Sequence, residues 1–254
     1  MAQRACRDAA SFGSNLKVRE IMATIDENLQ AVRQRIADAA RACGRDPAEV
    51  ALLAVSKTFG ADAIGAALQC NQHAFGENYV KEALEKIAAL PNAGAQWHFI
   101  GPIQSNKTRA IAEHFDWVHS VDREKIAERL AAARPANKAP LQICIEVNIG
   151  GEDSKSGIQP ANACALAKHI AALPQLKLRG LMAIPPASPD PLEQRRHFAA
   201  LRALSEQLVH EGIALDTLSM GMSADLEAAI AEGATIVRVG TAIFGERHAT
   251  QVTS

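Results

Sequence analysis

The stretch LLAVSKT (Leu52–Thr58) is an apolar run that ends in a lysine. Such a run is typical of a buried strand, and Gly60 and Asp62 after it indicate the start of a helix. In barrels and doubly wound sheets, the carboxyl ends of the strands carry the chemistry. Lys57 is therefore a candidate nucleophile, because burial favours the neutral amine, which attacks carbonyl carbons. A surface lysine that keeps its charged end in water would give the same local pattern.

Outward from this stretch, seven further apolar segments alternate with helical patterns, and an amphipathic helix over Ile25–Cys43 precedes them all. Including the first, the expected strands are Leu52–Lys57, His73–Gly76, Gln96–Gly101, Trp117–Val121, Leu141–Val147, Leu178–Ala183, Thr217–Met220 and Ile236–Val239. This alternation predicts an α/β fold, a single (β/α)8 TIM barrel with an extra N-terminal helix. An open doubly wound sheet is the alternative, and no Gly-x-Gly-x-x-Gly motif follows the first strand to support it.

The length and charge of the chain limit the classes of protein that it can belong to. Its 254 residues are close to the roughly 250 of one such barrel. Charged residues make up 22% and the formal net charge is −1, which argues against nucleic acid or an anionic membrane as the main partner. No apolar run approaches the roughly 18 residues that span a bilayer. The five cysteines show no Cys-x-x-Cys spacing, which favours reduced thiols in a cytoplasmic protein, and no spacing of metal ligands stands out.

The two ends of the chain are expected to lie outside the folded unit. Residues 1–22 are basic and lack the apolar segment of a secretion signal, so we expect a disordered extension, with translation starting at Met1 or Met22. The barrel domain is expected to span residues 23–248, followed by a tail over residues 249–254.

Glycine and hydroxyl residues follow the last two expected strands. Gly221 and Ser223 come after the seventh strand, and Gly240 and Thr241 come after the eighth. Barrels frequently bind phosphate at this place, where free backbone amides and a helix N-terminus attract anions. Turns and helix caps alone would also explain these residues.

Arg238 lies two residues before Gly240 and therefore shares the inward face of the eighth strand. A guanidinium inside the mouth of a barrel needs an acceptor. Pairing with a carboxylate such as Glu146 is one possibility, and contact with the ring nitrogen of a ligand is the other.

Seven blocks of this sequence resemble the YggS/PROSC family of pyridoxal phosphate homeostasis proteins. The blocks are AVSKT (Ala54–Thr58), FGENYV (Phe75–Val80), WHFIGPIQSNK (Trp97–Lys107), SKSG (Ser154–Gly157), RGLMAI (Arg179–Ile184), SMGMS (Ser219–Ser223) and RVGTAIFG (Arg238–Gly245). The resemblance runs from about Ile25 to Arg247. It implies a barrel like the N-terminal domain of alanine racemase, without the second domain of the racemase.

The resemblance also implies pyridoxal 5'-phosphate (PLP) as the cofactor. The implied cofactor-binding residues are Lys57, Asn78, Ser223, Arg238, Gly240 and Thr241. Lys57 would form the internal aldimine and Arg238 would face the pyridine nitrogen. Ser223, Gly240 and Thr241 would surround the phosphate, and Asn78 would lie near the ring.

We interpret the protein as a carrier without catalytic turnover that buffers PLP or delivers it, in transient contact with PLP-dependent apoenzymes. A PLP-dependent amino-acid racemase is the alternative, but the only tyrosine, Tyr79, is more simply an aromatic residue at the start of a helix. A lyase that uses Lys57 on a sugar phosphate is the third possibility. Lys155 could serve as a secondary amine or be an ordinary loop lysine. No exposed apolar stripe stands out, so we expect a monomer.

Overall fold

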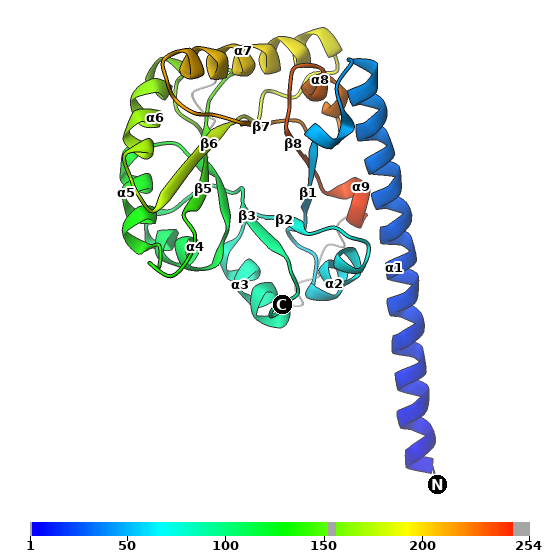
Figure 1. The fold of residues 1–254 in the computed structure, drawn as a ribbon. Coiled ribbons are helices and arrows are strands. Elements are labelled where there is room, and N and C mark those ends of the chain that lie inside the picture. The colour runs from blue at the N-terminus through cyan, green and yellow to red at the C-terminus, as the bar shows by residue number, and fades with distance from the viewer. Residues whose placement is uncertain (1, 152–155, 246–254) are drawn as a thin grey trace, which may run out of the picture.

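The strands form one closed parallel barrel in the order of the chain (Figure 1). The structure is a computed structural model that describes residues 2–151 and 156–245, with side chains from Ile21 onward. The strands are β1 (Ala51–Val55), β2 (Ala74–Glu77), β3 (Gln96–Phe99), β4 (Trp117–Val121), β5 (Leu141–Glu146), β6 (Leu176–Met182), β7 (Thr217–Ser219) and β8 (Ile236–Val239). The predicted (β/α)8 barrel is thus confirmed, with strand ends that differ from the expected ones by one or two residues.

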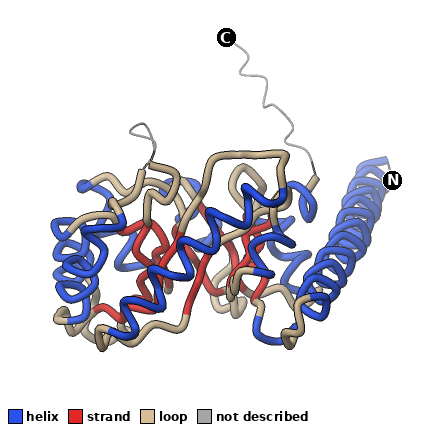
Figure 2. Tube along the Cα trace, turned by 90° about the horizontal axis from the view of Figure 1, so that it is seen from above, coloured by secondary structure: helices blue, strands red, loops and turns tan. Residues whose placement is uncertain are grey.

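Helices surround the barrel, as the view from above shows (Figure 2). The α-helices are α1 (Ala2–Ala42), α2 (Ala61–Gln69), α3 (Val80–Ala89), α4 (Thr108–His114), α5 (Glu124–Ala133), α6 (Ala163–Ala171), α7 (Pro191–His210), α8 (Leu226–Ala231) and α9 (Thr241–Phe244). Short 3-10 helices are η1 (Pro47–Glu49), η2 (Ser105–Lys107) and η3 (Pro160–Asn162). Of these, η2 directly precedes α4 and η3 directly precedes α6.

The apolar core has two parts because strand side chains alternate between the two faces of the sheet. The larger part joins the outer faces of the strands to the helices, with Phe75, Val237 and Phe198 fully buried in it. The smaller part fills the barrel with Leu53, Trp117, Cys144, Met182 and Ile236. Polar side chains, described below, share the interior with this small cluster.

Helix α1 begins before the amphipathic segment. Residues 2–22, expected as a disordered extension, belong to the same helix as the amphipathic segment, and the first turns project beyond the barrel (Figure 1). The stretch contains no proline and only one glycine, Gly13, and it is rich in alanine, so local propensity continues the helix without support from the core. From Ile25 to Ala40 the helix buries an apolar stripe. The boundary of the domain at residue 23 stays a prediction, and the expected tail lies outside the described residues.

Two kinds of feature are absent from the described residues. None of the helices is both long enough and apolar enough to cross a membrane. No group of three or more histidine, cysteine, aspartate or glutamate side chains there is arranged to hold a metal ion.

Candidate functional site

Four neighbouring strands carry all of the predicted cofactor-binding residues. Strands β7, β8, β1 and β2 follow one another around the closed barrel (Figure 1). The residues lie in β8 or directly after the four strands: Ser223 after β7, Arg238 in β8, Gly240 and Thr241 after β8, Lys57 after β1, and Asn78 after β2. Because the strands are parallel, these carboxyl ends meet at one rim. The structure therefore brings the predicted residues to one half of the barrel mouth.

The turn that carries Lys57 lies against α9. Lys57 is half-buried in a turn two residues after β1. Phe59, two residues further on, contacts Phe244 of α9 with ring centroids 5.1 Å apart. A Cβ atom on Gly240 would lie 3.1 Å from the carbonyl oxygen of Val55, so glycine lets the backbone after β8 approach the end of β1 closely. The lysine turn and the expected phosphate loop are thus in direct contact.

The loops after β7 and β8 are the expected phosphate site. Gly221 has a φ of 93°, and a Cβ there would lie 2.5 Å from the Cβ of Ala229, so the position requires glycine. Ser223 is half-buried in the turn before α8, and Thr241 is exposed at the first position of α9. Amides in the first turn of a helix have no partner within that helix, which leaves them available to an anion.

Helix α1 holds both of these loops in place. Arg35 Nη1 donates to the carbonyl oxygen of Ser223 at 2.8 Å. The same guanidinium makes a two-pronged ion pair with Glu227, with Nε and Nη2 at 2.5 and 2.6 Å from the carboxylate oxygens. Asn28 Nδ2 donates to the carbonyl oxygen of Ile243 in α9 at 2.9 Å. The extra N-terminal helix is therefore part of the support of the site, a role that the sequence did not predict.

Asn78 carries an unmet hydrogen-bonding group at the rim. Its Oδ1 atom is buried and has no hydrogen-bond partner within the described residues. A buried acceptor left unpaired costs about 1–3 kcal/mol, so its persistence favours a ligand hydroxyl or other donor at this position. The backbone of Asn78 is held close to Gly101, where a Cβ would lie only 2.4 Å from the carbonyl oxygen of Asn78.

Arg238 is buried inside the barrel and bonds to neutral oxygens. Nη1 donates to the carbonyl and hydroxyl oxygens of Ser219 at 2.6 and 2.8 Å, and Nη2 donates to the carbonyl oxygen of Ala183 at 2.9 Å. None of these three hydrogen bonds runs to Glu146, the carboxylate considered as its partner. Burial lowers the pKa of Arg238 to about 10, although Asp225 and Glu146 oppose the shift, so the guanidinium is charged at neutral pH.

A chain of hydrogen bonds runs from Arg238 across the barrel. Ser219 Oγ lies 2.8 Å from His119 Nδ1, His119 Nε2 lies 2.9 Å from His98 Nδ1, and His98 Nε2 lies 3.0 Å from Gln96 Oε1. Since the guanidinium can only donate, a consistent arrangement has each group donating to the next, down to Gln96. Burial lowers the pKa of His98 to about 3 and the pKa of His119 well below its usual value, so both rings are neutral.

His98 and Ser219 lie in two of the blocks that resemble the family, but the sequence predicted no hydrogen-bonded network inside the barrel. His119 and Ser219 were missed as interior polar groups. The alternation of Trp117, His119 and Val121 on one face of a strand was the available signal.

Glu146 is expected to make stability fall as pH rises through the mildly acidic range. Burial, with repulsion from Asp122, raises its pKa from 4.5 to about 7, although Arg238 opposes this. Between about pH 4.5 and 7, the folded protein therefore keeps a proton that the unfolded chain has lost. The contribution of this proton to the free energy of unfolding is fully present below this window and is lost above it. We expect Glu146→Gln to remove this decline, which amounts to at most about 3 kcal/mol.

Urea unfolding at a series of pH values measures this effect. Glu128→Gln is the control, since the side chain of Glu128 is 56% exposed. An equal slope in wild type and Glu146→Gln would show that Glu146 does not cause the decline.

Tyr79 and Lys155 were also considered from the sequence, and the structure describes only the first of them. Tyr79 is the N-cap residue of α3, next to Asn78, and is 58% exposed. Lys155 lies outside the described residues, and its possible role as a secondary amine stays a prediction.

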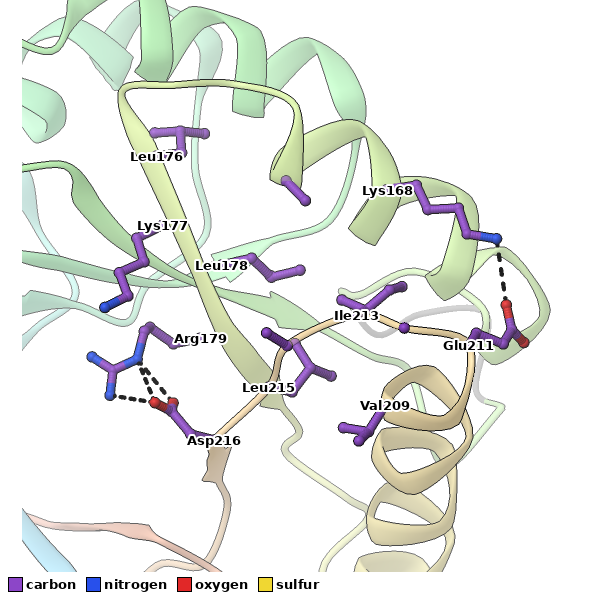
Figure 3. Close-up of a pocket in the computed structure, with 13 residues that line it drawn as sticks. Lys168, Leu176, Lys177, Leu178, Arg179, Val209, Glu211, Ile213, Leu215 and Asp216 are labelled. Carbon is purple, nitrogen blue, oxygen red and sulfur yellow. Dashed lines mark hydrogen bonds and ion pairs between the residues drawn. The ribbon is translucent and has the colours of Figure 1, made fainter.

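A cavity of about 720 Å³ lies away from this rim, on the outside of the barrel (Figure 3). It is lined by residues from α6, from β6 and from the segment between α7 and β7, among them Leu178, Ile213 and Leu215. Its charged groups are largely paired: Arg179 binds Asp216 at 2.8 Å and Lys168 lies 3.5 Å from Glu211. Leu176 begins β6 and Asp216 directly precedes β7, so this cavity is near the amino ends of these strands, opposite the predicted residues.

The barrel and its rim define a class of protein. Residues 27–248 match the family of the alanine racemase N-terminal domain, which covers the whole barrel. Alanine racemase from Corynebacterium glutamicum has the same fold, with a TM-score of 0.65 at 16% identity. The chain covers 63% of that racemase.

Relatives of higher sequence identity identify the family within this class. The chain is 58% identical over 226 residues to the pyridoxal phosphate homeostasis protein of Pseudomonas aeruginosa, covering 89% of this chain and 97% of the relative. PipY of Synechococcus elongatus, solved with PLP bound, has a TM-score of 0.75 at 38% identity, covering 87% of this chain and all of PipY. The chain belongs to the family of pyridoxal phosphate homeostasis proteins.

Proposed function

We propose that this protein binds PLP and acts in intracellular PLP homeostasis by buffering the cofactor or delivering it. The names of its close relatives and the PLP-bound structure of PipY support this function. The observation that supports it most directly is the contact of the Lys57 turn with α9, next to the expected anion-binding loop. An amine nucleophile beside a phosphate site would match the aldehyde and the phosphate of one small ligand.

The residues present fit the cofactor chemically. PLP supplies an aldehyde that condenses reversibly with a primary amine, a pyridine nitrogen, a ring hydroxyl and a phosphate. Lys57 would provide the amine, and the unmet Oδ1 of Asn78 would accept a hydrogen bond from the ring hydroxyl. Ser223, Gly240 and Thr241 would bind the phosphate. Arg238, charged and buried, would face the ring nitrogen and disfavour its protonation, because two adjacent cations repel.

A carrier fits these groups better than an enzyme does. Relatives that share half or more of the sequence are named as homeostasis proteins. An unprotonated ring nitrogen makes the cofactor a weak electron sink, which argues against transamination. Two-base racemisation needs a second acid–base group that is held opposite the lysine, and Tyr79 is largely exposed at the start of α3.

We further propose that the protein works as a monomer in the cytoplasm and meets PLP-dependent apoenzymes transiently. The cysteines described are free thiols, as a reducing compartment maintains them. Hand-over of the cofactor would begin when an amine of the recipient displaces Lys57.

Titration of the purified protein with PLP, followed by absorbance and by incubation with L-alanine and L-serine, tests this function. We expect an absorbance band in or near the visible region and no change of optical rotation. Racemisation at enzyme-like rates would show that the protein is a racemase and not a carrier. A colourless protein that binds no PLP would reject both.

A further inference from the structure

A second lysine, Lys86, is buried below the turn that carries Lys57. Lys86 is 4% exposed and donates to Glu77 Oε1 at 2.7 Å, to the carbonyl oxygen of Ser56 at 2.8 Å and to Glu82 Oε1. Glu82 and Lys86 are one turn apart on α3, and Glu77 ends β2. We call these three residues the acid–lysine cluster. A buried charged cluster is costly to form, so its presence at this place calls for a reason.

The acid–lysine cluster binds the residues on both sides of Lys57. Before it, the carbonyl of Ser56 accepts from Lys86, and the hydroxyl of Ser56 donates to Glu77 Oε1 at 2.6 Å. After it, the backbone N–H of Thr58 donates to Glu82 Oε1 at 2.5 Å. Hydrogen bonds that involve a charged group are the stronger ones, so Lys57 sits between two firmly held neighbours.

The turn adopts a conformation that it would not hold unaided. Thr58 has a φ of 71°, in the left-handed region that β-branched residues rarely enter. Such strain persists only where the surroundings enforce it, and it gathers at functional sites. Close packing against α3 is incomplete here, because residues 58–61 line a cavity of about 450 Å³ together with Glu82, Glu85 and Lys86. The hydrogen bond from Thr58 to Glu82 joins the two sides of this cavity.

We propose that the acid–lysine cluster is a positioning device that holds the strained Lys57 turn in the shape from which the lysine amine reaches the cofactor aldehyde. This inference rests on the proposed function and adds residues to it that do not touch the cofactor. Its direct consequence is selective: weakening the cluster impairs the reaction of the amine with the aldehyde, while the phosphate loops on β7 and β8 are unaffected.

The experiment compares two ligands. PLP engages Lys57 through its aldehyde, whereas 4'-deoxypyridoxine 5'-phosphate keeps the ring and phosphate and has no aldehyde. We expect Glu82→Ala to raise the ratio of the dissociation constants of PLP and the analogue about tenfold, as the loss of one charge-assisted hydrogen bond predicts. Glu85→Ala is the control, because Glu85 lies on the same helix and is exposed, and it should leave the ratio unchanged.

A conservative variant keeps the test decisive if Glu82→Ala does not fold. The amide oxygen of Glu82→Gln can still accept from Thr58, more weakly, so we expect the ratio to rise only about threefold. Equal weakening of both ligands, or an unchanged ratio in both Glu82 variants, overturns the positioning role. A wild-type protein that binds neither ligand would instead reject the proposed function itself.

Discussion

Lys57→Ala is expected to abolish covalent capture of PLP. Treatment of the wild type with PLP and borohydride should leave one reduced adduct, which peptide mass spectrometry places on Lys57, and the variant should carry none. The absorbance band should disappear with the adduct. We expect affinity for PLP to fall about a hundredfold, since the condensation supplies binding free energy that no other group replaces.

An analogue without the aldehyde and a control variant show whether the effect of Lys57→Ala is specific to the amine. The loops after β7 and β8 do not depend on the Lys57 side chain, so binding of 4'-deoxypyridoxine 5'-phosphate should change little. Lys107→Ala, at an exposed lysine in another of the resembling blocks, is the control and should keep the full adduct. An adduct on a different lysine, or an unchanged adduct in Lys57→Ala, would remove the basis of the proposed site.

Arg238→Met is expected to have the second large effect, on both the fold and the cofactor. The variant loses hydrogen bonds to Ser219 and Ala183 and leaves their buried carbonyl oxygens without this donor. Hydrogen bonds to a charged group contribute about 1.5–3 kcal/mol each, so we expect a loss of about 3 kcal/mol or more in the free energy of unfolding. The bound cofactor should meanwhile gain a proton on its ring nitrogen, because the neighbouring positive charge is gone.

Two measurements separate these effects. Urea unfolding gives the loss of stability, and the ¹⁵N chemical shift of labelled PLP reports the protonation of its ring nitrogen. Arg179→Met is the matched control, since Arg179 is a partly buried arginine that pairs with Asp216 near the other end of the barrel. It should lower stability without moving the ¹⁵N signal. An unshifted signal in Arg238→Met would show that the guanidinium does not face the ring nitrogen.

The sequence predicted the features of this protein that local pattern encodes. Alternating apolar runs and turn residues are local, so the strands and most helices could be placed to within a few residues, and Lys57 and Arg238 could be assigned to the rim. Partners that depend on side chains far apart in the chain could not be predicted. The contact of Arg35 with Ser223 spans 188 residues, and that of His119 with Ser219 spans 100.

Residues 2–22 are a different case, because they carry no apolar pattern that would indicate packing against the core. An alanine-rich stretch without proline can continue a helix that has already formed, and the expected disorder of this extension stays a prediction. Glu82 and Lys86 show the opposite case: their spacing of four residues was visible, but an ordinary surface pair has the same spacing. Only the burial of Lys86 distinguishes the two.

The contacts of α1 with the rim come from the part of the helix that follows Met22. Asn28 and Arg35, the two residues that secure the loops, both come after Met22. A polypeptide initiated at either methionine would keep both contacts, so the choice of start codon should leave cofactor affinity unaltered. Removal of the chain as far as Arg35 would instead release both loops together.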